Sequence, residues 1–276
     1  MCSVRSEERI ITRVRPARDK HAVLSMTADN SQDEHEQHPS FKRPGNVEIK
    51  IWRYMDLAKY LAILQRRSLF FARASLLGDP FEGSSTKLMV AAREHQLRDI
   101  GHPNLHLELA HYYKVLVNTY LISCWHMNEQ ESAAMWSLYL RSNEGVCIQS
   151  TYRRLRSSLP RCVRIGEVNY LNYDNEGFLP QVSFNFIMHK RKSFEHEREL
   201  RAVFWETDEG TEAQSYKPKI EPAGLWISVD LPAVIEKVYI TPTAEEWQAT
   251  VIRELTAKYD LQVPVVQSAL AESPLF

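Results

Sequence analysis

The sequence predicts an α+β fold, in which packed helices and a mixed sheet share a single core behind a disordered N-terminal tail. Short apolar runs of strand length alternate with amphipathic helical patterns along residues 47–276. The order of strands and helices is too irregular for a doubly wound parallel sheet. Residues 29–40 contain no apolar residue, so they cannot bury enough surface to offset the entropy of ordering. We therefore expect a tail over residues 1–46 and one domain over residues 47–276.

The first half of the domain is expected to alternate between strands and helices. Short apolar runs predict strands over residues 47–52, 69–72, 120–125 and 146–149. Asp56 can cap a helix whose inward face carries Leu57, Tyr60, Leu61 and Leu64. Further helical patterns cover residues 84–99, 105–118 and 131–140. Pro103 and Asn104 separate the first two of these helices, and Thr151 can cap another short helix.

The second half of the domain is expected to be richer in strands. Residues 163–173 have a strand pattern whose alternation slips at Gly166, which predicts a bulge. The remaining strands are expected over residues 200–205, 225–229, 238–241 and 263–266. Between the last two of these strands, Thr243 and Glu246 form a capping box. The helix that it opens is expected to turn inward Trp247, Val251, Ile252 and Leu255.

Composition and charge bound the class of protein and its partners. Apolar residues make up 44% and charged residues 25% of the chain, as in ordinary soluble proteins. The formal net charge of -1 argues against a nucleic-acid partner held mainly through phosphates. No apolar stretch approaches the roughly 20 residues that span a bilayer, so no membrane partner is expected. The four cysteines form no Cys-x-x-Cys pair and no secretory signal precedes them, which predicts reduced thiols and a cytoplasmic location.

An acidic run over residues 195–199 leads directly into the apolar strand at residues 200–205. Carboxylates that enter a core in this way are candidates for a site. On a strand, the three glutamates would share one face and would need cations or a raised pKa. On a helix, they would pair with Arg198 and Arg201 as a surface ladder of ion pairs, and both alternatives stay open. The candidate catalytic residues are Glu197, Glu195 and Glu199.

Two further segments carry groups that suit a site. Asp79 and Glu82 lie in a glycine-bounded turn, either as ligands of a metal or hydroxyl or as a turn cap and a helix-dipole partner. Cys124 and His126 share a strand face, but a zinc site would need two more ligands, so no metal site is predicted. Arg53 can clamp a phosphate or carboxylate, or pair with Glu197 or Glu199. The candidate ligand-binding residues are Arg53, Tyr54, Phe71, Asp79, Glu82, Ser123, Trp136 and Arg201.

Several spaced motifs occur in one order along the domain: Trp52-Arg53-Tyr54, Leu69-Phe70-Phe71, Asp79-Pro80-Phe81-Glu82-Gly83, Cys124-Trp125-His126, Met135-Trp136 with Tyr139, Gly145-Val146, Lys190-Arg191 and Glu195 through Arg201. In this order the chain resembles the bacterial domain-of-unknown-function family 2971, and within it a Cys-Trp-His subgroup. It departs from the family at Gly78, where an Asn is usual, and at Leu138, where a His is frequent. The resemblance implies a grouping and carries no established activity.

The motifs also suggest an activity. Transfer of ADP-ribose from NAD needs a carboxylate that stabilises an oxocarbenium-like transition state, an Arg on an early strand for phosphates, and aromatic residues for nicotinamide. Arg53, Phe70 or Phe71, Ser123 and a Glu-x-Glu occur in an order similar to that of the ADP-ribosyltransferase superfamily. We therefore expect a nucleotide or other small-molecule ligand, with NAD used by a group-transfer enzyme.

Two alternative functions remain. The first is a Mg²⁺-dependent nuclease or hydrolase that uses Asp79, Glu82, Glu197 and Lys192. The second is a non-enzymatic ligand-binding or defence-associated module in which the Glu and Arg residues only lock the fold.

Overall fold

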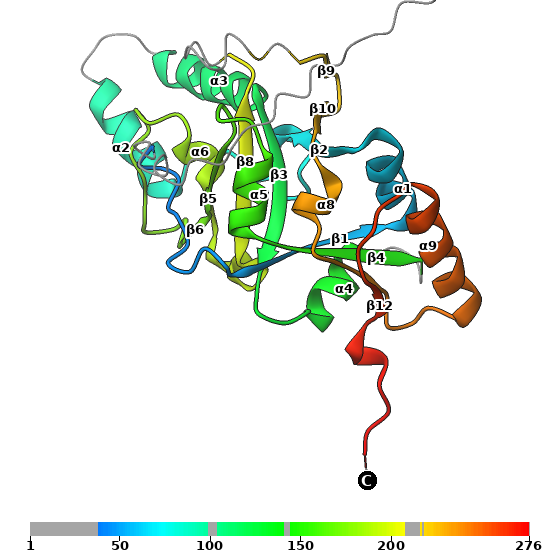
Figure 1. Cartoon of the computed structure of the whole chain (residues 1–276). Coiled ribbons are helices and arrows are strands. Elements are labelled where there is room, and N and C mark those ends of the chain that lie inside the picture. The colour runs from blue at the N-terminus through cyan, green and yellow to red at the C-terminus, as the bar shows by residue number, and fades with distance from the viewer. Residues whose placement is uncertain (1–37, 99–103, 141–143, 208–215, 217, 276) are drawn as a thin grey trace, which may run out of the picture. The chain divides into compact units, whose positions relative to one another are not determined.

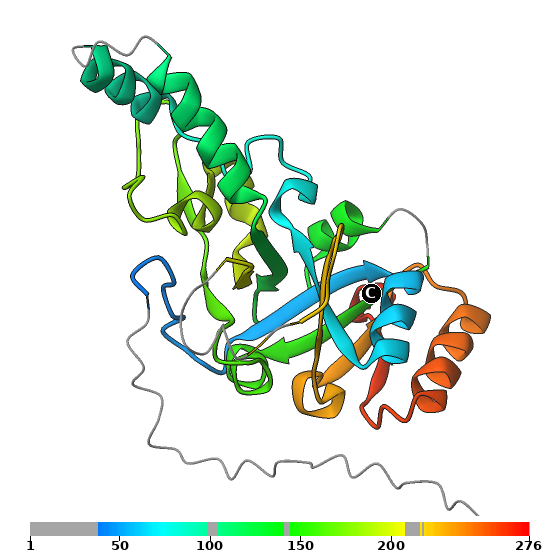
Figure 2. The same ribbon diagram turned by 90° about the horizontal axis from the view of Figure 1, so that it is seen from above.

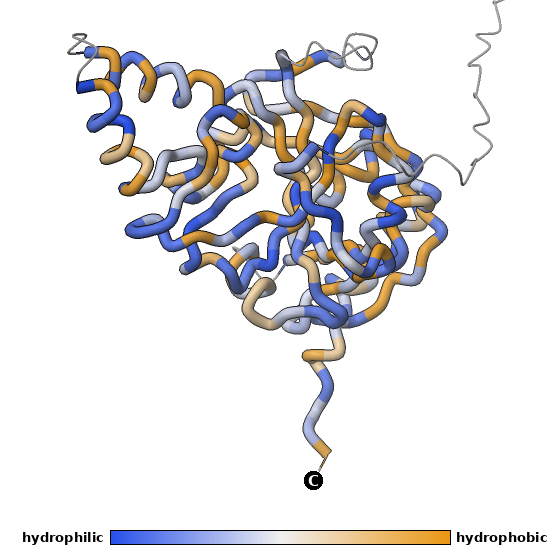
Figure 3. Tube along the Cα trace, turned by 90° about the vertical axis from the view of Figure 1, so that its left-hand side faces the viewer, coloured by the Kyte–Doolittle hydropathy of each residue, from blue (hydrophilic) through white to orange (hydrophobic). Residues whose placement is uncertain are grey.

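The computed structural model describes residues 38–98, 104–140, 144–207, 216 and 218–275, which belong to one compact unit, Gln37–Phe276. Of the expected tail over residues 1–46, residues 1–37 lie outside the described residues. The described residues confirm the α+β fold class, because helices pack against a mixed sheet (Figure 1). Figure 3 shows short apolar stretches alternating with polar ones along the chain, as the sequence pattern requires.

One mixed sheet organises the described residues (Figures 1 and 2). Its path runs in the order β12-β11-β4-β1-β3-β2-β10-β9, and β8 pairs with both β3 and β5. The strands are β1 (Lys50–Asp56), β2 (Ser68–Arg73), β3 (Tyr120–Met127), β4 (Gly145–Thr151), β5 (Arg164–Glu167), β8 (Glu199–Trp205), β9 (Ile220–Glu221), β10 (Gly224–Ser228), β11 (Lys237–Ile240) and β12 (Val265–Gln267). A separate parallel pair is formed by β6 (Asn169–Leu171) and β7 (His189–Arg191).

Helices cover the sheet and short 3₁₀ turns join its strands. The helices are α1 (Leu57–Arg66), α2 (Lys87–Leu97), α3 (Leu105–Val117), α4 (Ala133–Tyr139), α5 (Tyr152–Ser158), α6 (Asn185–Met188), α8 (Leu231–Val234) and α9 (Glu246–Lys258). The 3₁₀ turns are η1 (Ala74–Leu76), η3 (Lys192–Glu197) and η4 (Ala269–Ala271). Helices α2 and α3 lie side by side (Figure 2).

Because alternate residues of a strand face opposite sides of a sheet, each strand contributes to two parts of the core. The largest cluster takes Trp125 of β3 and Leu200 of β8, and α1, α5, α8 and α9 pack on it. On the other side, Ile122 and Val203 pack with α3 and α6. Helix α4 closes a third cluster over the neighbouring strands β1 and β4. Side chains at Cys124, His126, Glu199 and Arg201 belong to the α3 and α4 side by the same alternation.

Most expected strands and helices are confirmed within a few residues, and the main corrections lie in the second half. Residues 163–173 form two strands, β5 and β6, and Gly166 pairs in regular register with Arg201. There is no bulge at Gly166, because the break comes after it, at Val168. Helix α9 is capped by Glu245, whose side chain accepts from the backbone of Gln248. The inward face also differs from the expected one, because Trp247 and Val251 are exposed, whereas Ala249, Ile252 and Thr256 are buried.

The packed chain begins before residue 46, where the sequence suggested that the tail ends. Phe41 is 3% exposed, and its ring lies 5.1 Å from that of Phe184. The backbone N–H of Glu167 donates to the carbonyl of Lys42 at 2.9 Å, so this segment continues the edge of β5. The only apolar residue between positions 29 and 43 is Phe41, and one buried aromatic ring is enough to hold this short stretch.

The close approach of this segment to β5 explains Gly166 and yields a prediction. A Cβ at Gly166 would lie 2.6 Å from the Cα of Phe41 and 2.8 Å from its carbonyl carbon. Backbone cannot move aside as a side chain can, so Gly166→Ala should lower the free energy of unfolding by about 1–3 kcal/mol. Urea denaturation measures this change. The matched control is Gly78→Ala, since a Cβ there meets nothing within 4 Å. Equal midpoints for the two variants would contradict the packing of residues 38–42.

The middle of β3 has no strand partner on one of its two sides. On one side, β3 pairs with β8 along its length, from Tyr120↔Trp205 to His126↔Glu199. On the other side, its last residues pair with β1 and its first residues with β2. Among the described strands, none pairs on this side with Ser123, Cys124 or Trp125. We call this divergence of β1 from β2 the split.

Candidate functional site

The acidic run is neither a regular helix nor a regular strand. The 3₁₀ turn η3 ends at Arg198, whose backbone is left-handed with a φ of 39°. This single residue reverses the direction of the chain before β8 begins. The carboxylates on either side of it, Glu197 and Glu199, therefore both reach the ammonium of Lys190, at 2.5 and 3.5 Å. Glu195 remains exposed outside this group.

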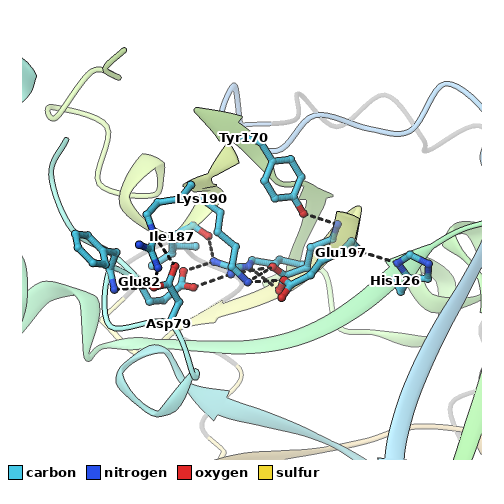
Figure 4. A network of polar contacts seen from close by, with 11 residues as sticks. Asp79, Glu82, His126, Tyr170, Ile187, Lys190 and Glu197 are labelled. Carbon is cyan, nitrogen blue, oxygen red and sulfur yellow. Dashed lines mark hydrogen bonds and ion pairs between the residues drawn. The ribbon is translucent and has the colours of Figure 1, made fainter. Parts of the chain in front are cut away.

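Arg201 lies at the centre of the site and is fully buried. Its Nε donates to one oxygen of Glu199 at 3.0 Å and its Nη2 to the other at 3.0 Å. Nη2 also donates to Glu82 at 2.9 Å, and Nη1 donates to the carbonyl of Ile187 at 2.6 Å (Figure 4). Glu82 is thus a partner of Arg201 from a distant turn. The pairing of Glu197 with Arg201 that a helix would give is not formed.

Asp79 performs the turn-cap role and also holds a cation. Its Oδ1 accepts the backbone N–H of Phe81 at 3.0 Å and a hydrogen bond from Nη2 of Arg191 at 2.7 Å. The guanidinium of Arg191 lies 4.1 Å from the centre of the Phe81 ring. The turn at residues 78–83 is therefore attached to β7 and β8 through two ion pairs, Asp79 with Arg191 and Glu82 with Arg201.

The two central glutamates differ in their electrostatics. Burial alone would raise the pKa of Glu199, but Arg201 and Lys190 outweigh it and lower that pKa to about 2. Burial raises the pKa of Glu197, and Lys190 offsets this only in part. Both oxygens of Glu199 accept hydrogen bonds, whereas in the described structure Glu197 uses only Oε2. Glu199 is therefore a fixed anion, and Glu197 is the carboxylate with an oxygen left for a ligand.

Aromatic and thiol groups border these carboxylates. The hydroxyl of Tyr170 accepts the backbone N–H of Glu199 at 2.8 Å. Burial, together with the charge of Glu197, raises the pKa of Tyr139, although 41% of the residue is exposed. Burial also raises the pKa of Cys124, whose thiol is hydrogen-bonded to Glu199. Cys124 lies in the middle of β3, so the carboxylates adjoin the split.

Arg53 lies in the split with an unused donor. Its Nη2 donates to the carbonyl of Phe70 at 2.8 Å, and its guanidinium lies 5.8 Å from the ring of Trp125. Its Nη1 is buried and has no hydrogen-bond partner. Burial lowers the pKa of Arg53 to about 10, so it is still a cation at neutral pH. Among the described residues no carboxylate pairs with it, and the expected pairing with Glu197 or Glu199 is not formed.

The other predicted binding residues have structural partners. Phe71 is fully buried in the largest cluster, and Ser123 accepts a hydrogen bond from the indole of Trp125 at 3.2 Å. The ring of Tyr54 lies 5.0 Å from that of Trp136. The hydroxyl of Tyr54 accepts the backbone N–H of Ser132, and the indole of Trp136 donates to Glu131.

The structure thus sorts the predicted residues into groups. It brings together in one buried network Asp79, Glu82, Glu197, Glu199 and Arg201. Arg53 and Ser123 lie on the split, and Tyr54 of β1 packs against Trp136 of α4. Residue-level reasoning missed Lys190, which appears in the sequence only within a motif of the family resemblance. Its strand β7 has three residues, too few to give a recognisable period.

His126 gives the site a dependence on pH. It is 5% exposed, its Nδ1–H donates to the carbonyl of Glu197 at 2.6 Å, and its Nε2 is buried without a partner. Burial lowers the pKa of His126 below its ordinary value of 6.5, and Arg198 and His196 act in the same direction.

A lowered pKa means that the unfolded chain binds this proton more readily than the folded one. The free energy of unfolding should therefore fall as the pH decreases below about 6.5. His126→Asn keeps a donor for the carbonyl of Glu197 and removes the titration, so it should flatten this slope. Urea denaturation at pH values from about 7 to about 5 measures it. His196→Asn changes an exposed imidazole and serves as the control. An unchanged slope in His126→Asn would contradict a neutral, buried imidazole.

The donor set does not suit Mg²⁺. Asp79, Glu82 and Glu197 are each bound to a cationic side chain, and Lys192 is exposed. A hard cation would have to displace these partners from its oxygen ligands. Among the described residues no group of three or more His, Cys, Asp or Glu side chains is placed to hold a metal ion.

Comparisons with known proteins give only distant likenesses. No protein-family model matches the chain, and no curated protein matches it at a significant level. Among the described residues no helix is long and apolar enough to cross a membrane.

Solved structures of DarT from Thermus sp. 2.9 are similar over most of the chain. The complex with ADP-ribosylated ssDNA is 10% identical with a TM-score of 0.39, and 83% of this chain and 98% of that chain are covered. The complex with carba-NAD+ is 8% identical with a TM-score of 0.38 and the same coverage of 83% and 98%. The complex with NAD+ is 8% identical with a TM-score of 0.37 and a coverage of 80% and 96%. Likenesses at this level carry no argument for function, which rests on the side chains described above.

Proposed function

We propose that this protein transfers ADP-ribose from NAD, with the reaction at Glu197 beside the split. One observation carries the proposal. Glu197 is a buried carboxylate with one oxygen unengaged, and its neighbour Glu199 is hydrogen-bonded to Cys124 on the unpaired stretch of β3, beside which the buried cation Arg53 has an unpaired donor. Buried polar atoms without partners are rare in folded proteins because they carry a desolvation penalty, and a ligand that hydrogen-bonds to them removes this penalty. NAD offers both an anion and sugar hydroxyls, so it fits this donor and this acceptor.

Each residue has a role that follows from its surroundings. Nη1 of Arg53 would donate to a phosphate oxygen, which makes a charge-assisted hydrogen bond. The free oxygen of Glu197 would accept a ribose hydroxyl, and its negative charge would stabilise positive charge that develops on the ribose as nicotinamide leaves. Lys190 holds the other oxygen of Glu197 and so fixes its orientation. Arg201 and Glu199 form the rigid support beneath this pair.

We also propose that the protein is a member of the domain-of-unknown-function family 2971 and that it is located in the cytoplasm. Cys124 and Cys147 are free thiols, which supports a reducing compartment. The expectation from net charge that nucleic acid is not a partner stays a prediction. A non-enzymatic binding module would keep the Arg53 site and show no turnover, so the assay below separates it from the enzyme.

The experiment measures nicotinamide release from NAD and the thermal shift that NAD causes. Wild type should release nicotinamide and should be stabilised by NAD, because a ligand that binds only the folded state raises its apparent stability. Arg53→Gln keeps a donor for the carbonyl of Phe70 and loses the charge. Since hydrogen bonds to charged groups contribute about 1.5–3 kcal/mol, it should bind NAD at least about tenfold more weakly.

The control is Arg253→Gln, which removes an arginine of the same charge from an exposed ion pair with Glu246. It should leave the NAD-induced shift unchanged. A wild-type protein that neither releases nicotinamide nor responds to NAD would end the proposal. A thermal shift without turnover would leave the binding module as the function.

A further inference from the structure

A second set of groups with the chemistry of a binding site lies at the far edge of the sheet. A hollow of about 390 Å³ is lined by residues of β9, β10, the end of α1 and the segment before β9. That volume falls in the range of small-molecule sites, which is roughly 300–1,000 Å³. The hollow is lined by Arg66, Tyr216, Lys219, Glu221, Trp226 and Ser228, together with a proline. None of these residues contributes to the carboxylate network.

The aromatic part of the hollow is built by strand register. Trp226 of β10 pairs directly opposite Phe70 of β2, which puts both rings on one face, and their centres lie 4.9 Å apart. The guanidinium of Arg66 lies 4.8 Å from the ring of Trp226. Trp226 is only partly buried, so its ring presents a flat apolar surface beside a cation.

The charged part of the hollow favours an anion. Arg66 and Lys219 contribute two positive charges, and Glu221 contributes the one negative charge of the lining. Arg66 reaches Glu221 only at 3.9 Å, and about half of each side chain is exposed, at 51% and 41%. Such a loose pair contributes little stability, so the guanidinium is free to turn toward a ligand. A planar ring beside two cations is the arrangement that takes a nucleobase and its phosphate.

We infer that this hollow binds a nucleoside 5′-phosphate, with the base stacked on Trp226 and the phosphate held by Arg66 and Lys219. Phe70 connects the hollow to the split, because its ring contacts Trp226 while its carbonyl accepts from Arg53. The nucleotide is therefore either a free mononucleotide or the adenylate half of NAD, and the second source rests on the proposed function. The chemistry of recognition is the same for both.

The test is titration calorimetry of the whole protein with AMP, adenosine and ribose 5-phosphate. AMP should bind more tightly than either part, because both the stack and the phosphate contacts are needed. Trp226→Ala should weaken AMP binding by about tenfold or more, and Trp226→Phe, which keeps a ring, should restore most of it. Arg66→Gln should weaken binding of AMP and leave adenosine unchanged.

The control is Lys59→Gln, which removes a positive charge from the exposed face of the same helix, where Lys59 pairs with Asp56. It should bind AMP as wild type does. No AMP binding by the wild type, or equal binding by Trp226→Ala with its fold intact by thermal melting, would overturn the inference.

The two sources separate in the nicotinamide assay. If the adenylate half of NAD occupies the hollow, Trp226→Ala should raise KM for NAD by about tenfold with little change in kcat. If KM is unchanged while AMP binding is lost, the hollow serves a free mononucleotide. AMP binding that depends on Trp226, found together with no turnover of NAD, supports the hollow and removes only the proposed transferase.

Discussion

Arg201→Met should be the most destabilising single substitution in the site, with a loss of about 3–5 kcal/mol in the free energy of unfolding. The guanidinium of Arg201 is fully buried and neutralises Glu199 and Glu82, whose side chains are only 5% and 4% exposed. Methionine fills much of the volume, so the cost arises because the buried Glu82 loses its ion-pair partner and the buried Glu199 keeps only Lys190, at 3.5 Å. Denaturant unfolding measures the loss in the free energy of unfolding. A variant that accumulates only as insoluble protein would also indicate strong destabilisation.

A matched control and a rescue make this expectation specific. Arg253→Met breaks an ion pair of similar length, 2.9 Å, whose side chains are 42% and 82% exposed, and it should change stability by less than about 1 kcal/mol. Adding Glu199→Gln and Glu82→Gln to Arg201→Met removes the stranded charges and should recover part of the loss. If Arg201→Met and Arg253→Met unfold at the same denaturant concentration, the network is not a buried one.

Glu197→Gln should abolish most of the nicotinamide release while leaving the fold and NAD binding in place. The amide keeps the shape of the side chain and loses the charge that would stabilise the transition state, so we expect a loss on the order of a hundredfold in kcat. Stability should change little, because Glu197 is the carboxylate whose charged form burial already disfavours. Steady-state assay of nicotinamide release measures the rate, and the NAD-induced thermal shift measures binding.

The neighbouring glutamates are the controls for this substitution. Glu195→Gln alters an exposed residue of the same run and should release nicotinamide at the wild-type rate. Glu199→Gln should lower stability, since Glu199 is the fixed anion between Arg201 and Lys190. If Glu195→Gln loses as much activity as Glu197→Gln, the assignment of Glu197 fails and the reaction centre lies elsewhere on the run.

The sequence predicts the parts of this molecule that local patterns determine. Short apolar runs such as residues 69–72 and 200–205 become strands, and their local apolar pattern is enough to predict this without knowing their partners in the fold. Arg53 was expected to close the first strand, but it lies in the middle of β1, which continues to Asp56. The carboxylates were expected to enter the core, and Glu197 and Glu199 do so.

What escaped prediction depends on single backbone conformations and distant partners. The backbone of Arg198 has a left-handed conformation that is uncommon for residues other than glycine. An arginine in the sequence therefore does not predict the reversal of the chain between Glu197 and Glu199. Glu82 and Asp79 lie 119 and 112 residues before their partners Arg201 and Arg191, so these two pairings follow from the topology alone. The capping box expected at Thr243 and Glu246 has a competitor at Glu245 and Gln248, and the structure uses the second.

The split divides the sheet into two groups of strands, called panels below, that can move relative to each other. One panel contains β1, β4, β11 and β12, the other contains β2, β10 and β9, and β3 is the spine between them. The second panel joins the spine through the register pairs Ala72↔Ile122 and Arg73↔Leu121, and Arg53 crosses from the first panel to Phe70. A panel attached along so short a seam opens at a lower free energy than the β3–β8 pair. A molecule bound by both Arg53 and Trp226 would connect the two groups of strands and stabilise their closed arrangement. Amide hydrogen exchange in β2 and β10 should then slow when it binds, at a distance from any catalytic group.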